Sequence, residues 1–528
     1  MPLSFLKPGL EMPRNNILLF IIISFVSIFI ASKTSIRDQI FQSVINLIDT
    51  SSYNAPSENL IREGAMIGAL ASVDDYPYTA YIPPASQDEY LMEIQGQYAG
   101  VGLSFLFRDT KSRELYFIPL RNSPASRAGL KFGDRLVEIS GRPVEALTSE
   151  DVLTSLKGEA GTSVDIKIRT RESIDQFNKI ETATLSNNRD LINSSALSGV
   201  KDLSLTREVI QQEVVKGNHL NSTGDWSFVL NTNNQIGYIA IEQFTDLTTP
   251  LTLAALDQLK GLNVSKLILD FRGNPGGFLP DAVAICNELL AYGTPIVETR
   301  FPRGDRRLFE SHNAHAPNFK IVVLVDEDSA SASEIVAAAL QDAGAGIVVG
   351  NRSYGKGTIQ SLFELPFHSG SVRMTTASFW RPSGKRIHRS KQNAEEDWGV
   401  SPTNGFNIPM EPWQKVYQKW VRALYDSETN FDPETHRKLC LAMESVLKDV
   451  CESLHLSTDE EKREKLAELG ITQDCIERYR NLPKVDSSAE DSPETNASSP
   501  EASFTPVGNF PFFDPQLDKA IEYLESIQ

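Results

Sequence analysis

Three serines alternate with alanines in the stretch SASAS, and the chain then runs into a segment with helical periodicity. The serines are Ser329, Ser331 and Ser333, and the apolar run IVVLV precedes them. A junction between a strand and a helix leaves backbone N–H groups without partners, and these groups and the helix dipole stabilise negative charge. Small neighbours keep the junction uncrowded. The pattern suits a serine nucleophile, although a lone serine before a helix more often serves only as an N-cap.

A serine nucleophile needs a base, and Lys356 is the candidate. It stands between Gly355 and Gly357, after the apolar run GIVVG. Flanking glycines let the backbone pass close to other segments, which would carry the ammonium group into a tight site. A lysine acts as a base only when neutral, so burial would have to lower its pKa by several units from about 10.4. Taken alone, this stretch more readily describes an exposed lysine in a glycine turn.

Other nucleophile arrangements fit the sequence less well. The G-x-S-x-G motif is absent and no histidine stands in a recognisable motif, which argues against a Ser-His-Asp hydrolase. Ser353 and Lys356 form S-x-x-K, the signature of β-lactamases and penicillin-binding proteins. That motif begins a helix, whereas here glycines flank the lysine, and its companions S-D-N and K-T-G are missing. We therefore do not assign Ser353 and Lys356 to this motif.

A third element is the stretch LILDFRGNPGG, residues 267–277, which predicts a buried strand followed by a glycine turn. Such a turn at the carboxyl end of a parallel strand exposes backbone N–H groups. One N–H group in an oxyanion hole contributes about 3 to 4 kcal/mol to the transition state. A simple strand-to-helix turn would have the same sequence.

Composition limits the remaining possibilities. The chain has 528 residues, enough for two to four domains, and a net charge of −18, which argues against nucleic acid as a partner. Its four cysteines form no CxxC pair, and no HExxH motif occurs, so neither a disulfide framework nor a metal site is expected. We expect the reaction to need no cofactor.

An almost wholly apolar stretch without charges, residues 17–32, lies near the N-terminus. Sixteen residues fall between a signal-peptide core and a full membrane span. We interpret it as an uncleaved signal anchor, with a cleaved signal peptide as the alternative. Either way the globular part is expected to be exported: the chain would be anchored in the inner membrane, with its catalytic part in the periplasm or an equivalent extracytoplasmic space.

The three turns, in this order, resemble those of the carboxy-terminal processing (tail-specific) serine peptidases, which use a Ser-Lys dyad. The resemblance implies that Ser331 is the nucleophile and that Lys356, 25 residues downstream, is its base. It assigns Gln360 as the residue that holds the lysine by a hydrogen bond. The oxyanion donors would be the backbone N–H groups of Gly277, or Gly276 as the second choice, and of Ala332.

Residues 99–103 and 122–144 resemble a PDZ domain. In this domain a glycine-rich loop, here Gly100, Val101, Gly102 and Leu103, binds the free C-terminus of a protein while the peptide adds a strand to the sheet. The expected substrates are therefore proteins with free, apolar C-termini. A homo-oligomer is possible. The alternative is a membrane-anchored PDZ scaffold with a catalytically silent protease fold.

The resemblance and the alternation of strands and helices predict an α/β fold: a ClpP/crotonase-like mixed α/β protease core with an inserted β-rich PDZ domain, a helical N-terminal segment and a helical, partly disordered C-terminal extension. The order expected along the chain is an N-terminal signal anchor (1–32), a helical N-terminal segment (33–96), a PDZ domain (97–171), an insertion or linker (172–203), the Ser-Lys peptidase core (204–412), a helical extension (413–483), a disordered acidic Ser/Pro-rich linker (484–510) and a short terminal helix (511–528).

Overall fold

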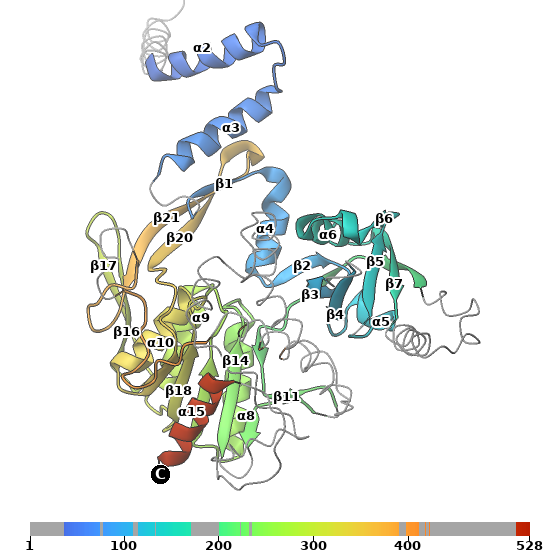
Figure 1. Cartoon of the computed structure of the whole chain (residues 1–528). Helices are drawn as coiled ribbons and strands as arrows, with labels where there is room; N and C mark the ends of the chain where they lie inside the picture. The colour runs from blue at the N-terminus through green and yellow to red at the C-terminus, as the bar shows by residue number, and fades with distance from the viewer. Residues whose placement is uncertain are drawn as a thin grey trace, which may run out of the picture. The chain divides into compact units, whose positions relative to one another are not determined.

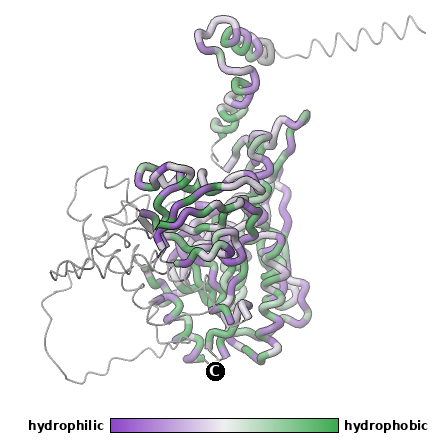
Figure 2. The backbone as a smooth tube through the Cα atoms, turned by 90° about the vertical axis from the view of Figure 1, so that its right-hand side faces the viewer, coloured by the Kyte–Doolittle hydropathy of each residue, from purple (hydrophilic) through white to green (hydrophobic). Residues whose placement is uncertain are grey.

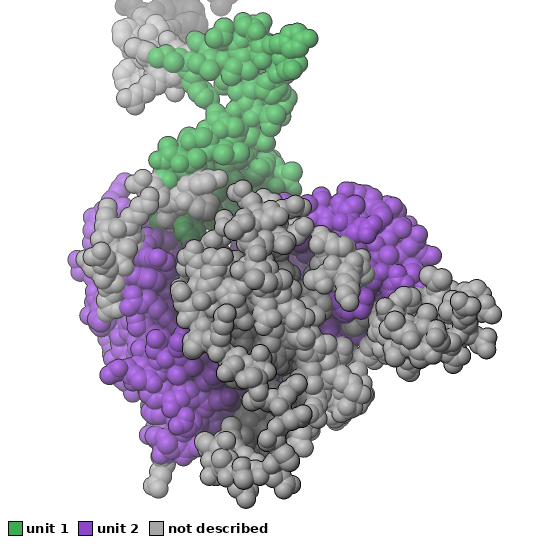
Figure 3. Space-filling view, in the orientation of Figure 1, with its two compact units in different colours: residues 1–87, 360–375 green, residues 88–359, 376–528 purple. Residues whose placement is uncertain are grey.

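The computed structural model describes residues 36–73, 78–108, 114–132, 134–170, 200–221, 223–231, 235–389, 398–410, 415, 418, 422 and 514–527. The predicted membrane anchor at residues 17–32 lies outside these ranges, as do residues 423–513 of the extension. Among the helices that the structure describes, none has the length and apolar character needed to cross a bilayer. The chain divides into two compact units (Figure 3), of which the first comprises Met1–Gln87 with Gln360–Thr375 and the second Asp88–Ile359 with Thr376–Gln528.

The first unit contains two N-terminal helices, α2 (Ile36–Ser51) and α3 (Glu58–Ala71), as the periodicity predicts. The Ser57 side chain caps α3 by accepting the Leu60 N–H. Figure 2 shows hydrophobic and hydrophilic residues interleaved along both helices. This unit also holds β1 (Ala80–Ile82), which pairs with the first residues of β21 (Ser371–Trp380), and most of β20 (Thr358–Glu364), which pairs with β21 as well.

The second unit is built around a sheet of six strands among the described residues (Figure 1). The strand order is β10-β14-β15-β18-β19, with β13 on β14. The strands β14, β15, β18 and β19 are parallel. Their bounds are β10 Val215–Lys216, β13 Val229–Asn231, β14 Ile236–Ile241, β15 Lys266–Asp270, β18 Lys320–Val325 and β19 Gly346–Gly350. Helices connect these parallel strands along the chain, which confirms the predicted α/β class.

Alternate residues of the central strands enter two different hydrophobic cores. Ile239, Leu269 and Val323 belong to the larger core, which also contains residues of the helices α8 (Thr248–Gly261), α9 (Leu279–Leu289) and α10 (Ala332–Asp342). Tyr238 and Leu324 belong to the smaller core, where the opposite face of the sheet meets the last helix, α15 (Pro515–Ser526). The terminal helix is therefore one layer of the central α/β core, which its sequence alone did not predict.

A second sheet in this unit has the order β3-β4-β5-β7-β8, with β6 on β5. Around it lie α4, the ladder β2–β9 and the helices α5 and α6. The bounds are α4 Gln87–Ile94, β2 Gln97–Gly100, β3 Leu103–Arg108, β4 Leu115–Pro119, α5 Pro124–Arg127, β5 Arg135–Ile139, β6 Arg142–Pro143, α6 Ser149–Leu156, β7 Ser163–Arg169, β8 Val200–Thr206 and β9 Glu208–Gln211. Because β8 pairs with β7 along seven residues, this sheet extends past residue 171, where the sequence analysis ended the domain.

Three short pairings complete the second unit. The strands β11 (His219–Leu220) and β12 (Trp226–Ser227) form a small antiparallel pair. The strand β16 (Pro295–Arg300) pairs with β17 (Arg306–Glu310) on one side and with the last residues of β21 on the other. These strands lie outside the central sheet, whose carboxyl ends carry the turns that the sequence analysis selected.

Candidate active site

The SASAS stretch forms the turn between β18 and α10, and its three serines have different surroundings. Ser331 is the residue before α10, and its backbone has φ 56° and ψ −112°, a conformation that costs energy for any residue except glycine. Its side chain is partly exposed, whereas Ser329 and Ser333 are fully buried. Only Ser331 therefore combines a strained backbone with access to solvent.

The two buried serines hold the turn in place. The Ser329 hydroxyl donates to the Phe271 carbonyl at 2.9 Å and accepts the Asp326 N–H at 2.9 Å. The Ser333 hydroxyl donates to the Asn274 carbonyl at 3.1 Å. Both bonds to carbonyl groups reach the segment after β15. The outer serines of SASAS thus tie this turn to the glycine turn. Residues 326–331 carry the predicted nucleophile and are called the nucleophile turn below.

The glycine turn after β15 is organised by the buried side chain of Asn274. Its amide donates to the Ile241 carbonyl at 2.6 Å, and its Oδ1 accepts the Gly276 N–H at 2.8 Å. The Asn274 carbonyl in turn accepts the Ala330 N–H at 2.9 Å, directly before Ser331. The turn therefore lies against the nucleophile turn, held by main-chain as well as side-chain bonds.

Two glycines of this turn have no room for a side chain. A Cβ on Gly276 (φ 98°) would lie 2.6 Å from the Ala330 carbonyl oxygen and 2.7 Å from the Ser331 Cβ. A Cβ on Gly277 (φ 143°) would lie 1.9 Å from the Phe244 carbonyl oxygen. Among the hydrogen bonds of the described residues, the Gly277 N–H donates to no acceptor, in contrast to the Gly276 N–H. Close approach of two backbones is thus the reason for the glycine pair.

The carboxylate of Glu334 joins the nucleophile turn to the lysine turn. Its Oε2 accepts the N–H groups of Ser331 at 2.9 Å and Lys356 at 2.8 Å. Its Oε1 accepts the Gly355 N–H at 2.7 Å and the Ser353 hydroxyl at 2.5 Å. In the sequence Glu334 is only a neighbour of the serines, because three of its four partners lie 19 to 22 residues away and meet it only in the folded chain.

Burial raises the pKa of the Glu334 carboxyl, and its four hydrogen bonds oppose that effect. The side chain is fully buried and stands in the first turn of α10, where the helix dipole favours negative charge. Among the residues that the structure describes, no cation binds this carboxylate. Glu334 therefore organises two turns through neutral donors alone.

The lysine turn is packed tightly on both sides of Lys356. A Cβ on Gly355 (φ 86°) would lie 2.7 Å from the Trp398 ring, and a Cβ on Gly357 would lie 2.5 Å from the His388 backbone nitrogen. Lys356 itself is partly buried. The flanking glycines thus allow the close backbone approach that the sequence suggested, and the structure brings the backbone of Lys356 and that of Ser331 onto one carboxylate.

Gln360, the predicted partner of the lysine, belongs to the first unit. Its side-chain amide donates to the Thr375 hydroxyl at 3.1 Å within that unit. Lys356 belongs to the second unit, so the bond from Gln360 to the lysine stays a prediction.

The predicted peptide-binding loop connects β2 to β3. Gly100 ends β2, Leu103 begins β3, and Val101 between them is buried. Gly102 has φ 78°, and a Cβ there would lie 2.1 Å from the Ser123 Cβ. The strand β3 is an edge of its sheet among the described strands. An edge strand beside a glycine loop is the arrangement that accepts an added peptide strand.

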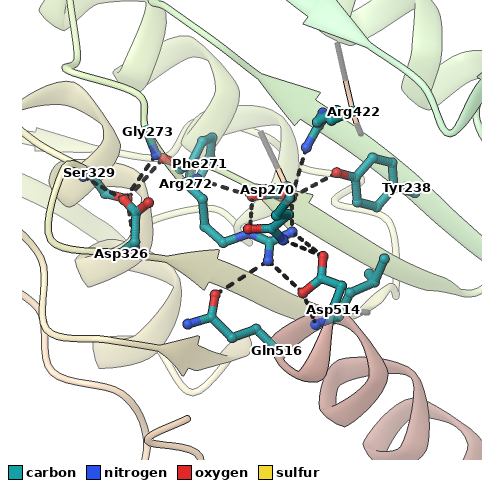
Figure 4. A network of polar contacts seen from close by, with 12 residues as sticks. Tyr238, Asp270, Phe271, Arg272, Gly273, Asp326, Ser329, Arg422, Asp514 and Gln516 are labelled. Carbon is teal, nitrogen blue, oxygen red and sulfur yellow. Dashed lines mark hydrogen bonds and ion pairs between the residues drawn. The ribbon is translucent and has the colours of Figure 1, made fainter. Parts of the chain in front are cut away.

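A second buried network lies at the end of β15, beside the glycine turn (Figure 4). The Arg272 guanidinium binds Asp270 at 2.6 Å and Asp514 at 2.8 Å, and Arg422 binds Asp270 at 3.1 Å. Burial by itself would raise the pKa of the Asp270 carboxyl, but the two guanidinium groups hold it well below its usual range. The Tyr238 hydroxyl donates to Asp270 at 2.7 Å. No local sequence pattern marks this network, because Arg272 and Asp514 are 242 residues apart.

The described residues contain no group of three or more His, Cys, Asp or Glu side chains that could hold a metal ion. The described residues offer the partly exposed Ser331 at a helix N-terminus, the Gly277 N–H without an acceptor among them, and the turn that carries Lys356. These are the parts required for acyl transfer.

Family models match two parts of the chain. Residues 235–403 match the model of peptidase family S41, and residues 119–170 match a PDZ domain. The carboxy-terminal processing protease CtpB of Bacillus subtilis is 27% identical over 383 residues, which cover 72% of this chain and 70% of that protein. CtpA of the same organism is 25% identical over 461 residues, which cover 85% and 88%.

Other similar proteins come from plants and from solved structures. The chloroplastic carboxyl-terminal-processing peptidase 3 of Arabidopsis thaliana is 31% identical over 324 residues, which cover 61% of this chain and 57% of that protein. A structure of the photosystem II D1 C-terminal processing protease is 24% identical, covers 74% of this chain and 91% of that one, and has a TM-score of 0.41. The chain therefore contains a region that matches peptidase family S41 and a region that matches a PDZ domain, and it is similar to serine-type carboxy-terminal processing peptidases.

Proposed function

We propose that this chain is an endopeptidase that takes the free, apolar C-terminus of a protein on its PDZ domain and cleaves the polypeptide with Ser331 and Lys356. The observation that carries the proposal is the state of Ser331. Of three neighbouring serines, it alone is accessible, stands at the start of a buried helix and has a strained backbone. Strain of this kind is common where a nucleophile must be presented to a substrate.

In the proposed reaction, the neutral Lys356 amine removes the proton from the Ser331 hydroxyl as Oγ attacks the peptide carbonyl carbon. The Gly277 and Ala332 amides stabilise the oxyanion. The Gly276 amide is the weaker candidate because it already donates to Asn274. The C–N bond then breaks, Lys356 returns the proton to the leaving amine, and a water molecule activated by Lys356 hydrolyses the ester. Gln360 holds the lysine.

The role proposed for the PDZ domain rests on the glycine loop and the edge strand β3. A peptide paired along β3 would place its carboxylate at the loop of Gly100, Val101, Gly102 and Leu103.

The protein acts outside the cytoplasm, anchored by residues 17–32. Membrane fractionation, followed by proteolysis of intact and opened cells, tests this placement.

The function is tested with an unstructured protein that has a free apolar C-terminus, incubated with the full chain and followed by mass spectrometry. Cleavage by the wild type, and not by Ser331→Ala or Lys356→Ala, is expected. Amidating the substrate C-terminus should slow cleavage, since the loop would lose its carboxylate. Full cleavage by either variant would refute the dyad, and binding without turnover in every sample would favour the scaffold alternative.

A further inference from the structure

The last helix of the chain begins at a charged contact with the peptidase core. The Asp514 side chain caps α15 by accepting the Leu517 N–H at 3.0 Å. The buried side chains Leu517, Ala520 and Leu524 then pack on the central sheet. The helix is thus fixed at its first residue by a carboxylate and along its length by apolar contacts.

The same carboxylate binds Arg272 in a two-pronged arrangement. Arg272 Nη1 donates to Asp514 Oδ1 at 2.8 Å and Nη2 to Oδ2 at 2.9 Å. The opposite edge of the guanidinium binds Asp270, with Nε to Oδ1 at 2.9 Å (Figure 4). The side chains of Arg272, Asp270 and Asp514 are only 8%, 1% and 2% exposed, so the pairs are shielded from solvent and their geometry is fixed.

Asp514 also balances charge. Arg272, Arg422 and Lys216 bring three positive charges to the network, and Asp270, Asp514 and Glu242 bring three negative charges. Without Asp514, a positive charge would remain in excess. Among the described residues, Arg272 Nη1 would keep only Gln516 Oε1, at 3.3 Å. Because a buried charge without a partner is strongly unfavourable, the guanidinium would be expected to move.

Movement of Arg272 would reach the site through the adjoining backbone. The Arg272 N–H donates to Asp270 Oδ1 at 3.0 Å, and the next residue, Gly273, donates its N–H to Asp326 Oδ1 at 2.9 Å. Asp326 begins the nucleophile turn. The glycine turn is therefore held at its start by the ion network and along its length by the turn that carries Ser331.

We propose that Asp514, the residue that caps the C-terminal helix, is a positioning residue of the peptidase site, which fixes Arg272 and through it the glycine turn. The catalytic part of this inference rests on the proposed function, in which Gly277 supplies an oxyanion donor. The structural part, the link from Asp514 to the turn, can be tested independently of any activity.

The test compares two variants of the full chain. Asp514→Asn keeps the size of the side chain and its ability to cap a helix but removes its charge. The matched control, Leu524→Ala, weakens the packing of the same helix without touching the ion network. Hydrogen exchange followed by mass spectrometry reports on the peptide 271–280. Values of kcat and KM are measured on a peptide with a free C-terminus, and the unfolding midpoints of both variants are recorded.

For Asp514→Asn we expect faster exchange in 271–280 and a kcat lowered about tenfold with KM unchanged, because misplaced catalytic groups slow chemistry more than binding. For Leu524→Ala we expect faster exchange in α15, with kcat within about twofold of the wild type at a comparable loss of stability. Unchanged exchange in 271–280 in Asp514→Asn, or equal losses of kcat in the two variants, would overturn the proposal. Cleavage by Ser331→Ala would refute the proposed function, and the exchange comparison would still decide the link.

Discussion

Two buried carboxylates, Glu334 and Asp270, belong to the networks around the candidate site, and they are stabilised in different ways. Glu334 receives four hydrogen bonds from neutral groups, three of them backbone N–H groups. Asp270 is bound by two guanidinium groups and a tyrosine hydroxyl. Both side chains are at most 2% exposed. The difference between them therefore comes from their partners and not from burial.

The consequence is an opposite response to pH. Burial raises the pKa of Glu334, so its contribution to stability is fully present below its unfolded pKa and is lost as pH rises through the folded value. The guanidinium groups outweigh burial at Asp270 and lower its pKa, so its contribution is present above the unfolded pKa and is lost only as pH falls through the folded one. Ionisation of Glu334 thus lowers the stability of the fold, whereas at Asp270 protonation lowers it.

The largest effect is expected from Glu334→Gln. The amide NH₂ would face N–H donors in place of an acceptor oxygen, which leaves buried groups unsatisfied and costs about 3 kcal/mol. Displacement of the serine and lysine turns should lower kcat/KM by about 100-fold. Urea unfolding and peptide cleavage measure the two effects. The exposed Glu364→Gln is the control, and a Glu334→Gln enzyme that matches it would contradict the role given to this carboxylate.

Asp270→Asn should affect stability more than catalysis. Removing one partner of the buried network costs about 3 kcal/mol in unfolding free energy, because two guanidinium groups lose a counter-charge. Arg272 keeps Asp514, so the turn should stay near its place and kcat should fall less than in Glu334→Gln. Unfolding curves and kcat values of Asp270→Asn and Glu334→Gln test this prediction. A large loss of kcat in Asp270→Asn at unchanged stability would contradict it.

Two glycines of the turn after β15 differ in the space around them, and this difference separates backbone strain from contact with Ser331. Gly273 (φ 71°) has open space where a Cβ would stand, so Gly273→Ala should cost about 1 kcal/mol from backbone strain, with little loss of activity. Gly276→Ala would press a methyl group against Ala330 and Ser331, and kcat should fall roughly 10- to 100-fold. Kinetics and unfolding of both variants are needed. Similar kcat values would show that contact with the nucleophile turn is unimportant.

The smallest effect concerns Asp518 on α15. Burial, helped by the nearby Asp514 carboxylate, raises the pKa of Asp518 from 3.8 to about 6. Its contribution to stability is therefore fully present below pH 3.8 and is lost as pH rises through about 6. Asp518→Asn should be slightly more stable than the wild type at pH 7.5 and no more stable at pH 3.5. Melting temperatures at the two pH values check this, and a variant that is less stable at pH 7.5 would show the sign to be wrong.

The sequence predicted those features that depend on neighbours along the chain. The apolar runs before Gly276 and Ser331 predict strands, and the small residues between strand and helix predict tight turns. The contacts of Glu334 with the lysine turn, and of Arg272 with Asp514 at a separation of 242 residues, depend on tertiary packing and leave no local pattern. The terminal helix looked like any short amphipathic helix, because nothing in its periodicity names the sheet that it covers.

The most direct test of the account is to identify the serine that becomes acylated. The full chain would be treated with a β-lactone that acylates serine nucleophiles, and tryptic peptides would be sequenced by mass spectrometry. We expect the adduct on Ser331, none in Ser331→Ala, and much slower labelling in Lys356→Ala. Acylation of Ser329 or Ser333, or unchanged labelling in Ser331→Ala, would contradict the assignment of the nucleophile.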